Sequence, residues 1–195
     1  MSHQYFITYK AFQVLSQFSP SQGKNTLSEY CKVPGDIYPI GRLDYDSEGL
    51  LILSNDPGLN HRLLDPSFGH EREYWVQVEG QVTPAVLREL SVGVTISLDG
   101  KPYRTKPSVA LDFSEAPTVP ERVPPIRFRK HIPTSWIRLM LTEGKNRQVR
   151  RMTAAVGFPT LRLIRYRIGG LRLDGLQPGD CRSVSRETLY NALFG

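Results

Sequence analysis

The chain has 195 residues, long enough for one substantial domain or one domain of two lobes with a core of its own. Its net charge of +6 and pI near 9.4 favour an acidic polymer as partner, although the total alone would suit many ordinary proteins. No run approaches the roughly 20 apolar residues that a membrane-spanning helix needs. The composition therefore excludes a helical membrane protein.

Cysteine and histidine usage argues against disulfides and zinc. The two cysteines, Cys31 and Cys181, form no CxxC pair, and the four histidines show no metal-ligand spacing with them. Residues 1–10 lack the apolar segment of a secretory signal. We therefore expect a cytoplasmic protein without disulfides or a metal site.

The first half of the chain predicts strands separated by short helices. Thr83-Pro84 is a good N-cap and first-turn pair, and Gly93 is a natural helix stop. In chain order, the expected elements are a strand over 5–9, a polar loop over 16–25, a buried strand over 50–54, a short helix over 58–64, a strand over 73–78 and a helix over 84–90.

The second half continues the alternation. Asp99-Gly100 predicts a hairpin turn, and four prolines make residues 114–125 a loop or inter-lobe connection. We further expect a strand over 135–141, a helix from the N-cap Asn146 to about Val156, a strand over 160–166 and a closing helix over 185–194. Strands mixed with helices indicate an α+β (mixed α/β) fold with a mixed sheet.

Basic residues are concentrated between positions 123 and 167, where Glu143 is the only acidic residue. A solvated basic face would more often interleave glutamate with lysine, so this one-sided stretch favours a phosphate-binding surface. The basic residues are Arg127, Arg129, Lys130, Arg138, Lys145, Arg147, Arg150, Arg151, Arg162, Arg165 and Arg167.

An acidic cluster, Asp44, Asp46 and Glu48, stands directly before the buried strand. Such a cluster is more often a turn cap or a solvated edge than a catalytic site, and a divalent metal site is a further reading. Arg42 adjoins the cluster and no second acidic group of similar density follows, which argues against metal. A nucleophilic carboxylate paired with an arginine fits this cluster better than a metal site does.

Two further features have ordinary structural readings. The segment Lys145 to Met152 places Arg147, Arg150 and Arg151 opposite its apolar face, as in any phosphate-binding helix. Tyr74, in an alternating strand, could simply be a packed aromatic residue.

The order of these motifs resembles the RsuA family of bacterial ribosomal RNA pseudouridine synthases. The residues concerned are the loop Gly41-Arg42-Leu43-Asp44, the Tyr74 strand, with Arg72 where the family has lysine, and the helix Lys145-Asn146-Arg147-Gln148-Val149-Arg150-Arg151-Met152. Residues 124–136 and 157–166 are similar to the large-subunit pseudouridine synthase E branch. The resemblance implies one catalytic domain over 1–195, with a mainly antiparallel sheet, flanking helices and two lobes around a central cleft. Because strand-like sequence begins near residue 5, we expect no S4 domain.

The resemblance also implies an activity: conversion of a specific uridine of 23S ribosomal RNA to pseudouridine, without cofactor or metal. Asp44 would be the nucleophile, attacking C1′ or C6 of a flipped-out uridine, a choice that the residues leave open. Tyr74 would stack on the uracil and take part in proton transfer, and Arg150 would hold Asp44 charged and oriented.

The same resemblance assigns RNA contacts. Arg42 would occupy the place vacated by the flipped base, and further contacts would come from Lys145, Arg147, Arg151, Arg165, Arg127, Arg129 and Lys130. We expect a monomer that acts on large-subunit ribosomal RNA. A non-catalytic ribosome-assembly factor on the same fold and a metal-dependent nuclease are the alternatives.

Overall fold

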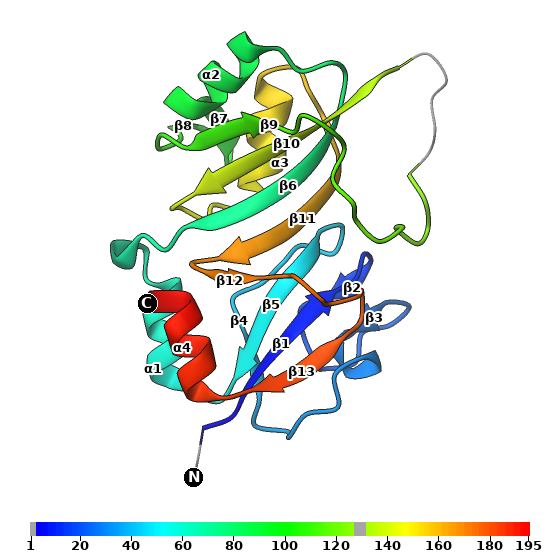
Figure 1. Cartoon of the computed structure of the whole chain (residues 1–195), viewed down its shortest axis with the longest axis vertical. Coiled ribbons are helices and arrows are strands. Elements are labelled where there is room, and N and C mark those ends of the chain that lie inside the picture. The colour runs from blue at the N-terminus through cyan, green and yellow to red at the C-terminus, as the bar shows by residue number, and fades with distance from the viewer. Residues whose placement is uncertain (1–2, 127–131) are drawn as a thin grey trace. The chain divides into compact units, whose positions relative to one another are not determined.

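The computed structural model describes residues 3–126 and 132–195. The chain forms two compact units, each shown in Figure 1: the first comprises Met1–His70 and Ile164–Gly195, and the second Glu71–Leu163. Most strand pairs are antiparallel, and helices flank the strands, so the predicted α+β class is confirmed.

The first unit is built on a sheet in the order β13 (Cys181–Val184), β1 (Tyr5–Lys10), β5 (Glu48–Ser54) and β11 (Thr160–Ile168). Only the β5–β11 pair of this sheet is parallel among the described residues. Every residue of β5 is buried, which explains its continuous apolar sequence. The shorter strands are β4 (Tyr38–Ile40) on β5, β12 (Leu171–Arg172) on β11, and the pair β2 (Val14–Leu15) and β3 (Asn25–Thr26).

One carboxylate joins both α-helices of this unit to β1. Asp56 caps α1 (Pro57–Leu64), where its Oδ1 accepts from the backbone N–H groups of Gly58 and Leu59 at 2.9 and 3.1 Å. Its Oδ2 accepts from the hydroxyls of Tyr5 at 2.8 Å and of Tyr190, in α4 (Arg186–Phe194), at 2.9 Å. The two helices accordingly lie near the same end of β1 and β5 (Figure 1).

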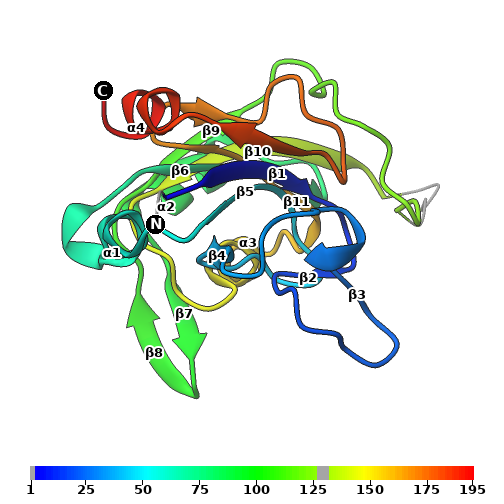
Figure 2. The same ribbon diagram turned by 90° about the horizontal axis from the view of Figure 1, so that it is seen from below.

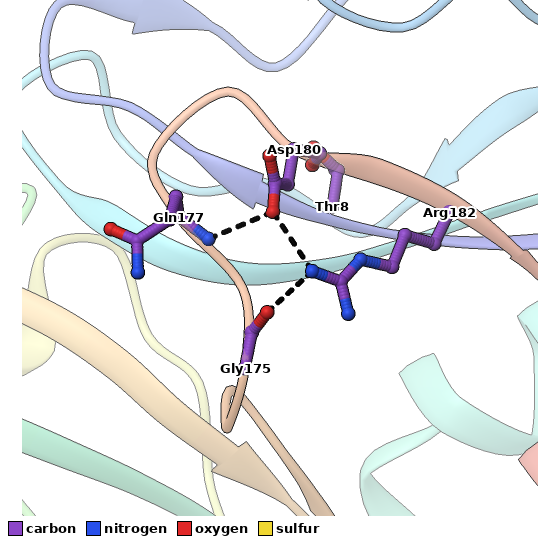
Figure 3. Close-up of polar contacts among 5 residues, drawn as sticks. All are labelled: Thr8, Gly175, Gln177, Asp180 and Arg182. Atoms are coloured by element: carbon purple, nitrogen blue, oxygen red, sulfur yellow. Dashed lines mark hydrogen bonds and ion pairs between the residues drawn. The ribbon is translucent and has the colours of Figure 1, made fainter.

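A polar turn holds the C-terminal strand against β1. Figure 3 shows the Asp180 carboxylate accepting from the backbone N–H of Gln177 at 3.0 Å and from the Arg182 guanidinium at 3.1 Å, and Arg182 also donates to the Gly175 carbonyl. The Asp180 carbonyl accepts from the Thr8 hydroxyl at 2.7 Å. Cys31 and Cys181 are free cysteines, and Cys181 packs against the core cluster that contains Cys31.

The second unit is built on β6 (Arg72–Glu79), β10 (Thr134–Leu141) and β9 (Val109–Asp112), all antiparallel. The hairpin of β7 (Thr95–Leu98) and β8 (Lys101–Arg104) projects from these strands (Figure 2). Helices α2 (Pro84–Val92) and α3 (Gln148–Ala155) both pack against one face of β6 and β10, because Leu90 and Met152 belong to the same core cluster as Val76 and Leu139.

The expected elements are all present with small shifts of their ends, and the hairpin turn at Asp99-Gly100 is confirmed by positive φ angles of 50° and 78°. The strands β2, β3, β4, β9, β12 and β13 and two short 3₁₀ helices, Leu27–Glu29 and Pro66–Phe68, were not expected. The proline-rich residues 114–125 form no helix or strand, as expected, and lie inside the second unit; the division between the units falls after His70 and Leu163 instead.

The predicted N-cap of α3 is wrong. The cap residue is Arg147, in the left-handed region at φ 51°, and it makes no side-chain capping bond. The Asn146 side-chain oxygen accepts from the Arg151 guanidinium at 3.3 Å instead, and the Gln148 side-chain oxygen accepts the Lys145 backbone N–H at 2.9 Å. A guanidinium within the helix therefore competes for the oxygen that would have capped it.

A glycine permits the parallel pairing of β5 with β11. Gly49 lies opposite Arg165 with a φ of +114°, and a Cβ built on it would stand 2.4 Å from the Arg165 carbonyl oxygen and 2.6 Å from its nitrogen. Both atoms belong to the backbone, so no side-chain rotation can relieve the clash. Residue 49 must be glycine for the strand after the Asp44 loop to reach β11.

We predict that Gly49→Ala lowers the free energy of unfolding by about 3 kcal/mol or more, because it combines a backbone clash with a strained φ. Urea unfolding measures this change. Gly35→Ala is the matched control, since a Cβ at Gly35 would have no heavy atom within 4 Å. Equal stabilities of the two variants would contradict the assigned pairing.

Candidate active site

Hydrogen bonds from Gln13 and Ser16 fix the loop that carries Asp44. Leu43 is 7% exposed, and the Ser16 hydroxyl oxygen accepts its N–H at 3.0 Å while donating to its carbonyl at 2.8 Å. The Gln13 N–H donates to the Tyr45 carbonyl at 2.9 Å, and the Ser47 N–H closes a turn on the Asp44 carbonyl at 3.0 Å. These bonds hold the backbone on both sides of Asp44, whose side chain stays partly exposed.

A buried lysine that the sequence analysis missed faces this acidic cluster. Lys10 is 1% exposed, and its Nζ donates to the carbonyls of Ala11 at 3.0 Å and Val14 at 2.7 Å. Burial lowers the pKa of Lys10 to about 7; the carboxylates of Glu48, Asp46 and Asp44 act in the opposite direction, and the Arg165 charge adds to the lowering. The sequence feature that could have indicated Lys10 is its position in an alternating strand: a lysine stands where an inward-facing apolar residue is expected.

Arg165 occupies the interior of the first unit. Its side chain is 5% exposed, and its Nε donates to the Leu50 carbonyl at 2.8 Å. Glu48, 2% exposed, lies in register with the neighbouring Ile164. An RNA contact was expected to lie at the surface, whereas this guanidinium lies inside the first unit.

In the second unit, Tyr74 and Arg150 come from elements that pack on one core. Tyr74 shares the face of β6 that carries Val76, and its half-buried ring packs against that core cluster. Arg150 lies on α3 beside Val149 of the same cluster and is partly buried. The Tyr74 ring is therefore held by packing, and both predicted residues stay partly accessible.

The single acidic residue of the basic segment is buried and accepts several hydrogen bonds. Glu143 is 7% exposed and accepts from the Tyr103 hydroxyl at 2.6 Å, the Lys106 backbone N–H at 2.8 Å and the Gln148 side-chain amide. The hydrogen bond to Glu143 raises the pKa of Tyr103. Glu143 thus shapes the turn before α3, and its burial takes its charge away from the basic surface.

The predicted RNA-contact residues differ in exposure. Lys145 and Arg147 are exposed in the second unit, and Arg42 is exposed in the first. Arg151 is partly buried and donates to the carbonyls of Asn146, at 3.1 Å, and Ser97. Arg127, Arg129 and Lys130 lie outside the described residues. All these RNA contacts, with that of Arg165, remain predictions.

Residues 3–126 and 132–195 contain neither a metal-ligand cluster nor a membrane-spanning helix. Within these ranges no three or more histidine, cysteine, aspartate or glutamate side chains are grouped so that they could hold a metal ion. Nor does any helix there have the length and apolar character needed to cross a membrane.

Comparison with known proteins shows extended similarity. Residues 4–155 match the family model described as RNA pseudouridylate synthase. The chain is 50% identical over 171 residues to ribosomal large subunit pseudouridine synthase E of Xanthomonas axonopodis pv. citri (strain 306), covering 87% of each protein. It is 46% identical over 176 residues to the protein of that name from Vibrio vulnificus (strain CMCP6), covering 90% of this chain and 73% of the relative.

A solved structure agrees with the sequence comparisons. A crystal structure described as a pseudouridylate synthase superposes with a TM-score of 0.80 at 25% sequence identity. The match covers 98% of this chain and 74% of the other.

We predict that Lys10 makes stability rise with pH. Its pKa is about 7 in the folded chain against 10.5 for an ordinary lysine, so between these values the unfolded chain binds more protons than the folded one. Between pH 7 and pH 9, the unfolding free energy of the wild type should gain on the order of 2 kcal/mol relative to Lys10→Met. Urea unfolding of both proteins at both pH values measures this difference, and parallel pH profiles would contradict the assignment.

Proposed function

This chain belongs to the RNA pseudouridylate synthase family, and we propose that it converts one uridine of large-subunit ribosomal RNA to pseudouridine. The names of its relatives support the ribosomal substrate. The observation that carries the proposal is the Asp44 loop, whose backbone is held on both sides by Ser16 and Gln13 and whose carboxylates face the buried Lys10.

In this proposal Asp44 is the nucleophile. Its attack would occur at C1′ of the ribose or C6 of uracil, after which the base rotates and rejoins the sugar through C5. A carboxylate does this work only if it is correctly placed, and the backbone fixed by Ser16 and Gln13 serves this need. No redox change occurs, so the proposed reaction requires no cofactor.

Further roles follow from the motifs. Tyr74 is assigned to stacking on the uracil and to proton transfer, which its half-buried ring on β6 permits. Arg150 is assigned to orienting the nucleophile. A uridine in a stem must flip out, at a cost of a few kcal/mol, and the exposed Arg42 is assigned to the vacated place in the stack. We further propose that the protein acts as a monomer in the cytoplasm.

Asp44→Asn tests the function directly. The purified chain is incubated with a large-subunit ribosomal RNA transcript in EDTA, and pseudouridine is mapped by carbodiimide-stop primer extension. We predict one new stop with the wild type and a loss of at least about a thousandfold in rate with Asp44→Asn, because an amide cannot act as the nucleophile. Asp46→Asn, a neighbouring carboxylate of the same loop, is the matched control and should retain the stop.

The remaining outcomes separate the alternatives. A stop that survives Asp44→Asn would refute the assignment of the nucleophile. RNA binding without any stop, on the transcript and on assembling subunits, would favour a non-catalytic assembly factor. Shortened RNA whose formation EDTA prevents would favour a nuclease.

A further inference from the structure

A groove of about 700 Å³ opens on the first unit beside the Asp44 loop. Apolar rings make much of its wall, from Phe18, Pro34, Tyr38 and Pro39. Its volume lies within the roughly 300–1,000 Å³ of sites that hold one small ligand. The groove is therefore sized for a small group rather than for a protein surface.

Two large side chains of the groove are left unusually exposed. Tyr38 is 64% exposed, although its backbone is fixed by pairing with Ser54 on β5, and Leu64 at the end of α1 is 45% exposed. Leu64 approaches the backbone just after β4 at Gly41, where an added Cβ would lie 3.0 Å from the Leu64 Cδ2. A rigid backbone that presents an open aromatic ring is typical of a binding surface.

The charge that lines the groove is positive. Among the described residues that line it, Arg42 is the only one that carries a charge, and the others are apolar or neutral polar groups such as Gln17 and Asn60. Arg42 stands two positions before Asp44, so this end of the groove continues into the candidate catalytic loop. An aromatic wall beside a basic residue suits RNA, because bases stack on aromatic rings and the RNA backbone is anionic.

We propose that this groove binds an unpaired nucleotide of the substrate RNA with its base against Tyr38, near the target uridine whose vacated place in the stack is assigned to Arg42. The inference rests on the proposed function, since it takes RNA as the ligand. The nucleotide is distinct from the uridine that reacts, because Asp44 does not line the groove. The groove would contribute to the choice of target by requiring an unpaired nucleotide beside it.

Truncation of Tyr38 tests the groove. Tyr38→Ala removes the stacking of one base on an aromatic side chain, so it should weaken binding of a target-containing stem-loop RNA about tenfold, measured by fluorescence anisotropy. Tyr38→Trp keeps a stacking surface and should bind like the wild type, with indole fluorescence quenched by the RNA.

Phe68→Ala is the matched control, because Phe68 is an aromatic residue of the same unit, 50% exposed, outside the groove lining. Equal binding by Tyr38→Ala, Phe68→Ala and the wild type would refute nucleotide binding in the groove; if these proteins still form pseudouridine, the proposed function stands. RNA binding that depends on Tyr38, with no pseudouridine formed by the wild type, would refute the proposed function but support nucleotide binding in the groove. An effect of Tyr38→Ala seen only when ribosomal proteins are present would overturn the RNA assignment in favour of a protein partner.

Discussion

Charge compensation inside the first unit is the constraint on which the candidate nucleophile depends. Lys10, Glu48 and Arg165 are each at most 5% exposed, and any one of them left alone would be costly to bury. Lys10 also donates to the carbonyl of Val14, close to the serine that holds the backbone of the Asp44 loop. The electrostatic environment and the shape of the loop are therefore set by the same short segment.

Most of the fold could be predicted from local sequence, because its longer elements carry strong signals. The buried run of β5, the alternation in β6 and the glycine turn between β7 and β8 depend only on neighbouring residues. The missed strands are short and take their structure from a partner: Tyr38–Ile40 pairs with β5, and Cys181–Val184 pairs with β1. No pattern within three or four residues reports such pairing, since it is decided by distant parts of the chain.

The site was less predictable than its motifs suggested. Motif order led to Asp44, Tyr74 and Arg150, but nothing in it pointed to Lys10, whose importance comes from burial. The basic segment was also treated as one surface, whereas Arg165 lies in the interior and Arg151 is bonded to nearby carbonyls. Composition counts charges without saying which of them face solvent, and that distinction decides which can meet a phosphate.

The division of the chain has a consequence for its synthesis. The second unit is one continuous stretch, Glu71–Leu163, whereas the first needs residues 164–195 to supply β13, α4 and most of the β11 strand that meets Gly49. On the ribosome the middle of the chain can therefore fold while the strands before it still lack their partners. A nascent or truncated chain that ends before residue 164 therefore carries the Asp44 loop without Arg165, the residue that lies opposite Gly49 in the finished sheet.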